Sequence, residues 1–173
     1  MSLNEEQALI NRAAQGDANA FDALWNAITP KLFGYLVNTV RDHALAEDIL
    51  QSTWLKAIAA LPDFTARGGG VSAWLFTIAK NECREHWRKS GRETPLDDEA
   101  HDRAADAAEN HEEKLLIEQT LAALSENDRE ILRLRYVADL SMNEIAQVLK
   151  LNFVTVRVRV HRALAHAREV LST

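Results

Sequence analysis

Five cations with no acid among them occupy the stretch from residue 150 to residue 168: Lys150, Arg157, Arg159, Arg162 and Arg168. Arginine binds phosphate and can hold the edge of guanine through two hydrogen bonds, and each such pair discriminates between bases by ~1–3 kcal/mol. Binding of this kind depends on the local field and not on the charge of the whole chain. The stretch indicates a DNA-contacting surface, although a solvated helix face could have the same composition.

A second group of cations recurs at four-residue spacing, and its members are Lys80, Arg84 and Arg88, followed by Lys89. On a helix this spacing places them in one row, which can follow a phosphate backbone, with Asn81 beside it. Aromatic side chains can stack on an unpaired base, and Trp74 and Trp87 are the candidates by type. At its helical spacing Trp74 also fits a core position. The row therefore indicates a second nucleic-acid surface.

These cations stand out because the chain as a whole has a net charge of −6. The net charge is −3 over residues 1–79, +3 over 80–92, −8 over 93–113 and +2 over 114–173. Residues 93–113 are acidic, rich in alanine and almost without large apolar groups, so they cannot bury enough surface to offset the entropy of ordering. We expect them to form a tether between two folded parts, and a plain solvated spacer is as good an interpretation as a strand that occupies a basic channel.

No constellation typical of catalysis appears. Cys83 and His86 lie three residues apart, but two ligands do not make a zinc site, and a lone thiol is usually inert packing. We therefore expect no enzyme, metal, cofactor or small-molecule substrate. The single cysteine excludes an internal disulfide framework, and neither a signal peptide nor a long uncharged apolar run is recognisable, so we expect a cytoplasmic protein without membrane insertion.

The elements that position these groups are expected to be helices, because 47% of residues are apolar and the chain contains only three prolines and six glycines. Thr29 can cap a helix that begins at Pro30, and Ser72 can cap the helix that carries Lys80. The glycines at 68–70 indicate a loop over 63–71. The helices expected in the first half are 4–16, 18–27, 30–40, 44–61 and 72–88.

The second half carries capping-box signals at Ser125 and, more clearly, at Ser141, where Glu144 occupies the third helical position. Val154, Val156, Val158 and Val160 alternate as in a strand, but the apolar stripe continues at helical spacing to Leu171, which favours a helix. The helices expected here are 114–124, 126–137, 141–149 and 153–171. The fold class is thus all-α, with a domain at 1–92, an acidic linker at 93–113 and a second domain at 114–173.

A short capped helix, a three-residue turn and a longer basic helix have the spacing of a helix-turn-helix. If Val156, Val160 and Ala163 face the core, the outward residues are Thr155, Arg159 and Arg162, with Arg157 and His161 on one flank. Val158 also faces outward, where it could meet a thymine methyl group or pack against a protein. Two bundled helices with a charged outer face remain the alternative.

Four blocks, in order, resemble the extracytoplasmic-function sigma factors of RNA polymerase. Residues 46–51 with 54–57 (AEDILQ and WLKA) look like the polymerase-binding helix, and residues 72–81 (SAWLFTIAKN) are similar to the helix that opens and recognises the minus-ten element. Residues 134–136 and 140–149 resemble the start of the domain that recognises the minus-thirty-five element, and 155–157 with 161–163 resemble its recognition helix. The match covers nearly the whole chain except the tether.

The resemblance implies an alternative sigma factor that binds core RNA polymerase and directs promoter-specific initiation, and that is commonly held inactive by an anti-sigma factor, here expected to be membrane-linked. The implied core-polymerase contacts are Glu47, Asp48, Leu50, Gln51 and Trp54. The implied minus-ten contacts are Lys80, Asn81, Arg84 and Arg88. The implied upstream-element contacts are Thr155, Arg157, Arg159, His161 and Arg162.

The sequence departs from the family pattern at several positions. Lys150 replaces the usual glycine of the turn, so the turn either avoids the left-handed conformation or tolerates a strain of roughly 1 kcal/mol or more. Val154 and Val158 replace small residues, Ser52 replaces an acid, and Glu85 replaces an aspartate. These changes bear on which promoter sequence the chain recognises more than on its function. Two rival functions stay open, a decoy that binds an anti-sigma protein and a helix-turn-helix regulator that acts alone.

Overall fold

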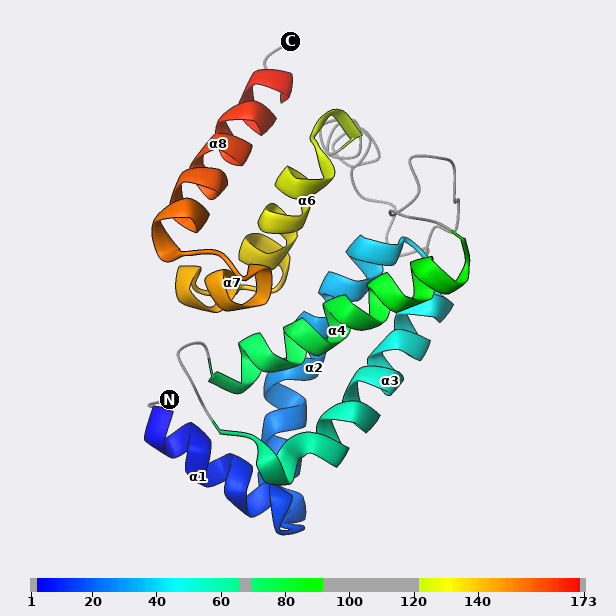
Figure 1. Ribbon diagram of the computed structural model, residues 1–173, viewed down its shortest axis with the longest axis vertical. Helices are drawn as coiled ribbons and strands as arrows, with labels where there is room; N and C mark the ends of the chain where they lie inside the picture. The colour runs from blue at the N-terminus through cyan, green and yellow to red at the C-terminus, as the bar shows by residue number, and fades with distance from the viewer. Residues whose placement is uncertain (1–2, 66–69, 92–121, 172–173) are drawn as a thin grey trace, which may run out of the picture.

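The computed structural model of the chain describes residues 3–65, 70–91 and 122–171, and every regular element in these ranges is helical (Figure 1). The first part contains α1 (Leu3–Ala14), α2 (Ala18–Val40), α3 (His43–Ala60), the short 3₁₀ helix η1 (Leu61–Asp63) and α4 (Gly70–Lys89). The second part contains α6 (Glu126–Leu132), the π-helical turn η2 (Arg133–Val137), α7 (Met142–Leu149) and α8 (Phe153–Leu171). The all-α prediction is confirmed.

The predicted break before Pro30 is wrong, because α2 runs unbroken from Ala18 to Val40 with Pro30 inside it. A proline inside a helix removes one hydrogen bond and costs about 3 kcal/mol. Here one buried apolar stripe continues on both sides of the proline and holds the two halves in line. Its members are Leu24, Ile28, Leu32, Tyr35 and Leu36. Thr29 does not cap a new helix, and its buried hydroxyl has no hydrogen-bond partner among the described residues.

The predicted cap of α4 is also wrong, because this helix begins at Gly70 and includes Ser72 in its first turn. The start is held by another helix: the Val71 N–H donates a hydrogen bond of 2.7 Å to Glu6 Oε1 on α1. Gly70 has φ 65°, and a Cβ at this position would collide with the Glu6 carboxylate. The positive φ therefore favours glycine where α1 and α4 meet.

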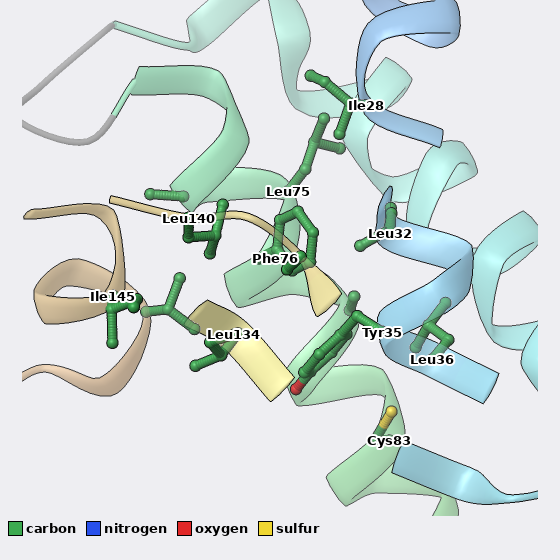
Figure 2. Close-up of a cluster of buried hydrophobic side chains, with 14 of the residues drawn as sticks. Ile28, Leu32, Tyr35, Leu36, Leu75, Phe76, Cys83, Leu134, Leu140 and Ile145 are labelled. Atoms are coloured by element: carbon green, nitrogen blue, oxygen red, sulfur yellow. The ribbon is translucent and has the colours of Figure 1, made fainter. Parts of the chain in front are cut away.

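The two parts share one hydrophobic core. Figure 2 shows Leu32 and Tyr35 of α2 and Phe76 of α4 packed towards Leu134 and Leu140 from the second part. Helix α4 packs against α7, and α2 packs against η2. We call this the closed arrangement. It places the helix that carries Lys80 directly against the helix-turn-helix.

The predicted tether at 93–113 and the predicted helix at 114–124, apart from its last three residues, lie outside the described residues. Among the helices that the structure does describe, no segment has the length and apolar character that a membrane crossing requires.

Candidate DNA-binding and polymerase-binding surfaces

Helix α7 and the turn after it are fixed by local hydrogen bonds. The capping box at Ser141 is confirmed: its N–H donates to Glu144 Oε2 at 2.7 Å, and its hydroxyl accepts from the Glu144 N–H at 3.3 Å. The helix ends at Lys150, which adopts the left-handed conformation with φ 54° and ψ 44°. The Leu151 N–H closes the turn on the Ala146 carbonyl at 2.9 Å. Of the two alternatives for Lys150, the chain therefore tolerates the strain.

Helix α8 begins after Asn152, whose side-chain oxygen accepts a hydrogen bond of 2.7 Å from the Thr155 N–H. The segment with alternating valines is helical, as expected. Val156, Val160 and Ala163 are buried against the rest of the second part. This anchoring stripe fixes which side of α8 faces outward.

The cations of α8 point away from the core. Arg157, Arg159, His161 and Arg162 are all exposed, and Thr155 is half-buried. Within residues 3–65, 70–91 and 122–171, no carboxylate forms an ion pair with any of the three arginines. The surface formed by Arg157, Arg159 and Arg162 is called the α8 face below. It is a concentrated and uncompensated positive field, which suits phosphate binding.

The cations of α4 are arranged differently, although the row has the expected spacing. Lys80 is 25% exposed in its side chain, and its Nζ lies 3.5 Å from Glu130 Oε1 of α6. Arg88 donates hydrogen bonds of 2.9 and 2.7 Å to the two oxygens of Glu85, and these bonds lower the pKa of Glu85 to about 2. Asn81 and Arg84 are exposed. We call Lys80, Asn81, Arg84 and Arg88 the α4 face.

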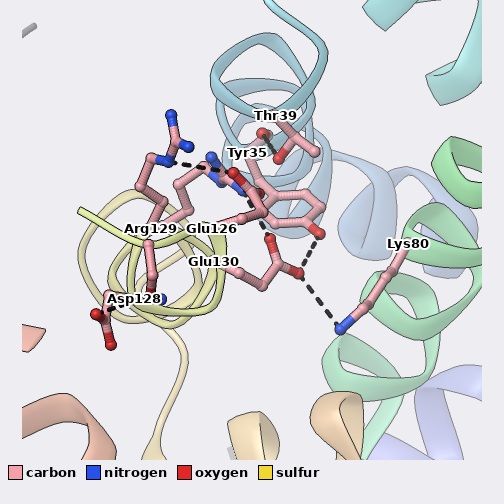
Figure 3. A network of polar contacts seen from close by, with 9 residues as sticks. Tyr35, Thr39, Lys80, Glu126, Asp128, Arg129 and Glu130 are labelled. Carbon is pink, nitrogen blue, oxygen red and sulfur yellow. Dashed lines mark hydrogen bonds and ion pairs between the residues drawn. The ribbon is translucent and has the colours of Figure 1, made fainter. Parts of the chain in front are cut away.

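Glu130 joins the two parts through polar contacts (Figure 3). The Tyr35 hydroxyl donates to Glu130 Oε1 at 2.9 Å, and Arg133 Nη2 donates to Glu130 Oε2 at 3.2 Å. Burial, followed by the charge of Glu130, raises the pKa of Tyr35 well above its usual value, so the phenol remains a neutral donor. Burial acts to lower the pKa of Arg133, but the carboxylates of Glu130 and Glu126 outweigh it and raise that pKa.

Sequence reasoning missed the contact between Tyr35 and Glu130. The two residues are separated by 95 positions, and no local pattern connects them. A second long-range ion pair, between Lys31 and Asp139 at 2.8 Å, supports the same closed arrangement from the solvent side. Lys31 lowers the pKa of Asp139 by this contact, so the aspartate is charged at neutral pH.

The residues expected to contact polymerase lie on α3, which is capped by Asp42 through a hydrogen bond of 3.0 Å from the Leu45 N–H. Three of these residues, Glu47, Asp48 and Gln51, are exposed, and Leu50 is half-buried. These four form the α3 face. The same helix exposes Leu55 and Ile58, at 63% and 47% of their surfaces.

The structure places the fifth expected polymerase contact, Trp54, in the core. It is 5% exposed and packs against Phe21 and Trp25, with ring centroids 5.7 and 4.8 Å away. Helical spacing explains this placement, because Trp54 follows buried Ile49 and precedes buried Ala57 on the inner side of α3. The indole therefore supports the α3 face from below.

Two further features bear on the chemistry of these surfaces. Trp74 is partly buried and lies against Phe64, with ring centroids 4.5 Å apart. Cys83 is buried on the inner side of α4, and burial raises its pKa to about 12, which keeps the thiol protonated. No group of three His, Cys, Asp or Glu residues suited to a metal ion occurs in the described part of the chain.

The chain is similar in sequence to known sigma factors over both of its parts. The family model Sigma-70 region 2 matches residues 24–93, and the model Sigma-70, region 4 matches residues 114–166. The RNA polymerase sigma-H factor of Pseudomonas aeruginosa is 32% identical, over 94% of this chain and 92% of its own length. The ECF RNA polymerase sigma factor SigK of Mycobacterium ulcerans is 27% identical, over 95% and 92%.

Solved structures agree with these relatives. CnrH, in complex with the cytosolic domain of CnrY, superposes with a TM-score of 0.73 at 28% identity, covering 96% of this chain and 97% of CnrH. The sigma factor RpoE of Bartonella quintana, in complex with the anti-sigma factor NepR, superposes with a TM-score of 0.69 at 28% identity, covering 88% and 97%. The chain therefore belongs to the extracytoplasmic-function family of RNA polymerase sigma factors.

Proposed function

We propose that this alternative sigma factor divides its work among three surfaces: the α3 face binds core RNA polymerase, the α4 face contacts the minus-ten element, and the α8 face contacts the upstream element. The single observation that carries the proposal is the α8 face, whose three arginines project from a helix-turn-helix without carboxylate partners in the described residues. An isolated structural bundle gains nothing from such a field. The protein itself contributes binding, and the polymerase contributes the chemistry.

On α3 we assign direct polymerase contact to Glu47, Asp48, Leu50 and Gln51, because these side chains reach the surface. Trp54 acts through them, since its buried ring sets the position of the helix against Phe21 and Trp25. The exposed apolar surface of Leu55 adjoins this face and can be covered by the partner.

On α4 we assign minus-ten contacts to Lys80, Asn81, Arg84 and Arg88. The pair of Trp74 and Phe64 lies towards the start of the same helix and offers a stacking platform for an unpaired base. Lys80 becomes fully available only when it leaves Glu130. Arg88 likewise has to exchange Glu85 for a phosphate.

On α8 we assign upstream contacts to Thr155, Arg157, Arg159, His161 and Arg162. A recognition helix of this kind enters the major groove, where arginine pairs with guanine and the flanking cations bind phosphate. Thr155 is half-buried and hydrogen-bonded to Asn152 through its N–H, so its hydroxyl is placed at the start of the helix. It is suited to a backbone phosphate.

The closed arrangement must open for both elements to be bound together. Elements centred at minus ten and minus thirty-five are separated by about 25 base pairs, or about 85 Å at ~3.4 Å per pair. Helix α4 packs against α7 in the structure, so the two surfaces cannot span that distance. The 21 residues of the linker 93–113 reach at most about 75 Å, so the linker and the width of the two folded parts together can span that distance. We propose domains at 1–92 and 114–173 with an acidic linker at 93–113.

We further propose that an anti-sigma factor regulates this chain. The Bartonella quintana sigma factor was solved with the anti-sigma factor NepR, and CnrH was solved with the cytosolic domain of CnrY. This chain resembles both over most of its length. It acts in the cytoplasm, where polymerase and DNA are found, and a membrane-linked partner would hold it at the inner membrane.

The first test measures whether core RNA polymerase retains the full chain. The second maps the transcript starts that appear when the chain is overexpressed, and then measures transcription from those promoters by the reconstituted holoenzyme. Retention together with promoter-specific starts is the expected result. Failure of core to retain the chain would leave the stand-alone DNA-binding regulator as the better function. Retention without specific starts would favour the decoy. If the chain also binds promoter DNA without polymerase, and core polymerase does not increase that binding, the result counts against the sigma function.

A further inference from the structure

We propose that Val158, with Val154 beside it, recognises the C5-methyl group of thymine in the upstream element. The inference rests on the proposed function of the α8 face and deepens it, because it names a base that this helix selects.

Both valines are exposed to solvent. Val154 is 67% exposed and Val158 is 41% exposed, although both carry branched apolar side chains on a helix that buries Val156 and Val160 almost completely. A single exposed valine needs no explanation. Two on the same outward side of the basic helix, flanked by exposed cations, form an apolar strip within a cationic surface.

Both valines lie on the side of α8 that faces away from the core. An α-helix turns by about 100° per residue, so Val158 lies about 200° around the axis from buried Val156, nearly opposite the anchoring stripe. Val154, Val158 and Arg162 recur at four-residue spacing and form one row along that outward side. The two valines therefore approach whatever surface Arg162 approaches.

The base edges of DNA differ in their chemistry, and only one of them suits a valine. Base edges in the major groove present hydrogen-bonding groups, and the thymine methyl is the one apolar group among them. A valine can neither donate nor accept a hydrogen bond, so facing another base leaves a polar edge without a partner. Contact with the methyl group instead removes apolar surface of both partners from water. Thymine is the base that fits.

A protein partner could also cover two exposed valines. The charges beside them favour DNA, because Arg157, Arg159 and Arg162 surround the strip and have no carboxylate partner in the described residues. A protein surface would have to supply acids to all three arginines as well as an apolar contact. Duplex DNA supplies phosphates and methyl groups at once.

The experiment uses holoenzyme, formed from core polymerase and the full chain, on a promoter duplex with a mapped upstream element. Each thymine of that element is replaced in turn by deoxyuridine, which removes only the C5-methyl group. With the natural chain we expect about a fourfold loss of affinity at one or two neighbouring thymines, equivalent to the ~0.8 kcal/mol of one buried methylene-sized group. Val158→Ala should bind the thymine duplex about fourfold more weakly and show no further loss with deoxyuridine.

Leu171→Ala is the matched control, because Leu171 is an exposed apolar residue, at 49%, near the end of the same helix. This variant should keep the natural response to deoxyuridine. Both substitutions replace an exposed helical side chain by alanine, the best helix former, so the fold should be preserved. Thermal unfolding of each variant checks that point.

Three results would overturn the proposal. One is a natural holoenzyme that binds the upstream element but responds to deoxyuridine at no position. Another is a response that survives in both Val158→Ala and Val154→Ala. The third is a Val158→Ala chain with unchanged DNA binding and weakened capture of an anti-sigma factor, which would assign the strip to a protein. A natural holoenzyme that ignores the upstream element altogether would instead refute the proposed function of α8, so the two failures are distinguishable.

Discussion

The α4 face and the α8 face are both cationic helix surfaces, yet the chain treats their charges in opposite ways. On α4, Lys80 is paired with Glu130 and Arg88 is paired with Glu85. On the α8 face, Arg157, Arg159 and Arg162 have no such partner among the described residues. A row of cations in a sequence therefore does not reveal whether those cations are free to bind phosphate or are already paired with carboxylates. The α8 face is therefore open to a partner, whereas on the α4 face Lys80 and Arg88 are each held by a carboxylate.

At Lys80 the pairing arises from tertiary packing, whereas the pair of Arg88 with Glu85 is local to α4. Glu130 accepts a hydrogen bond from Tyr35, pairs with Arg133 and faces Lys80, so a single carboxylate of the second part serves three groups (Figure 3). Separation of the two parts removes this carboxylate from Lys80 and from Tyr35 together. Binding of a phosphate by Lys80 then replaces one charge-assisted contact by another.

The largest contrast should appear in thiol reactivity, between the inner side of α4 and the outer side of α8. Because the pKa of Cys83 is raised to about 12, alkylation of this thiol at pH 8 should be about a thousandfold slower than that of an ordinary thiol. A thiol introduced on α8 as Val158→Cys, in a Cys83→Ala chain, should react at least as fast as an ordinary thiol, because the arginines around it favour the thiolate. Timed iodoacetamide labelling followed by mass spectrometry measures both rates. Equal rates in the folded protein would show that Cys83 is not buried as the structure places it.

The next largest effect is expected from Arg162→Ala. The proposed contact of this exposed arginine with a base edge predicts that its loss weakens binding of the upstream element about tenfold or more, corresponding to ~1–3 kcal/mol. Affinity for core polymerase should not change. Titration of holoenzyme on upstream duplex, with Arg12→Ala on α1 as a control for loss of one positive charge, measures the effect. Equal loss of core and DNA affinity would contradict the division between the faces.

The converse substitutions lie on α3. Asp48→Ala and Gln51→Ala should each weaken core binding about tenfold, near 1.4 kcal/mol, because both side chains are exposed on the α3 face. Upstream-element binding by the assembled holoenzyme should be retained. Competition with an unmodified sigma factor for core measures this, and Asp22→Ala provides an exposed acid outside the face. Unchanged competition would remove both residues from the contact surface.

A smaller effect is expected from Glu130→Gln, which removes the charge opposite Lys80. Binding of single-stranded minus-ten DNA by the free chain should increase a few-fold, and its salt dependence should steepen by about one phosphate contact. The buried Arg133 loses one of its two carboxylates, so the free energy of unfolding should fall by about 1–3 kcal/mol.

Glu85→Gln is the matched control for that variant. It frees Arg88 in the same way but leaves the contact between the two parts intact. Fluorescence titration with labelled oligonucleotide compares the two variants. If both give the same gain while Glu130→Gln leaves the closed arrangement unchanged, the closed arrangement does not limit access to α4.

Local signals in the sequence predicted the helix-turn-helix well. The capping box of Ser141 and the buried stripe of Val156, Val160 and Ala163 operate within a few residues, and the structure shows both. The prediction failed at Pro30, where the local preference for a helix start lost to apolar packing along the whole of α2.

The candidate site could be predicted less completely. The α8 cations are exposed as the helical period requires, because their orientation depends only on neighbours in sequence. Trp54 was expected at a surface and lies in the core, since its ring is covered by residues of α2. The pairing of Lys80 with Glu130 links positions 50 residues apart and depends on how the two parts pack. Contacts between residues so far apart in the chain produce no periodic pattern from which a single sequence could predict them.

The most direct test of the account is to find where each face lies on a promoter. Photoreactive side chains placed at Val158 and at Arg84, in separate holoenzymes on one mapped promoter, report the DNA segment nearest to each helix. A crosslink at the upstream element is expected from position 158 and one at the minus-ten element from position 84, about 25 base pairs apart, or about 85 Å. Crosslinks from both positions to the same segment, or from neither to DNA, would contradict it.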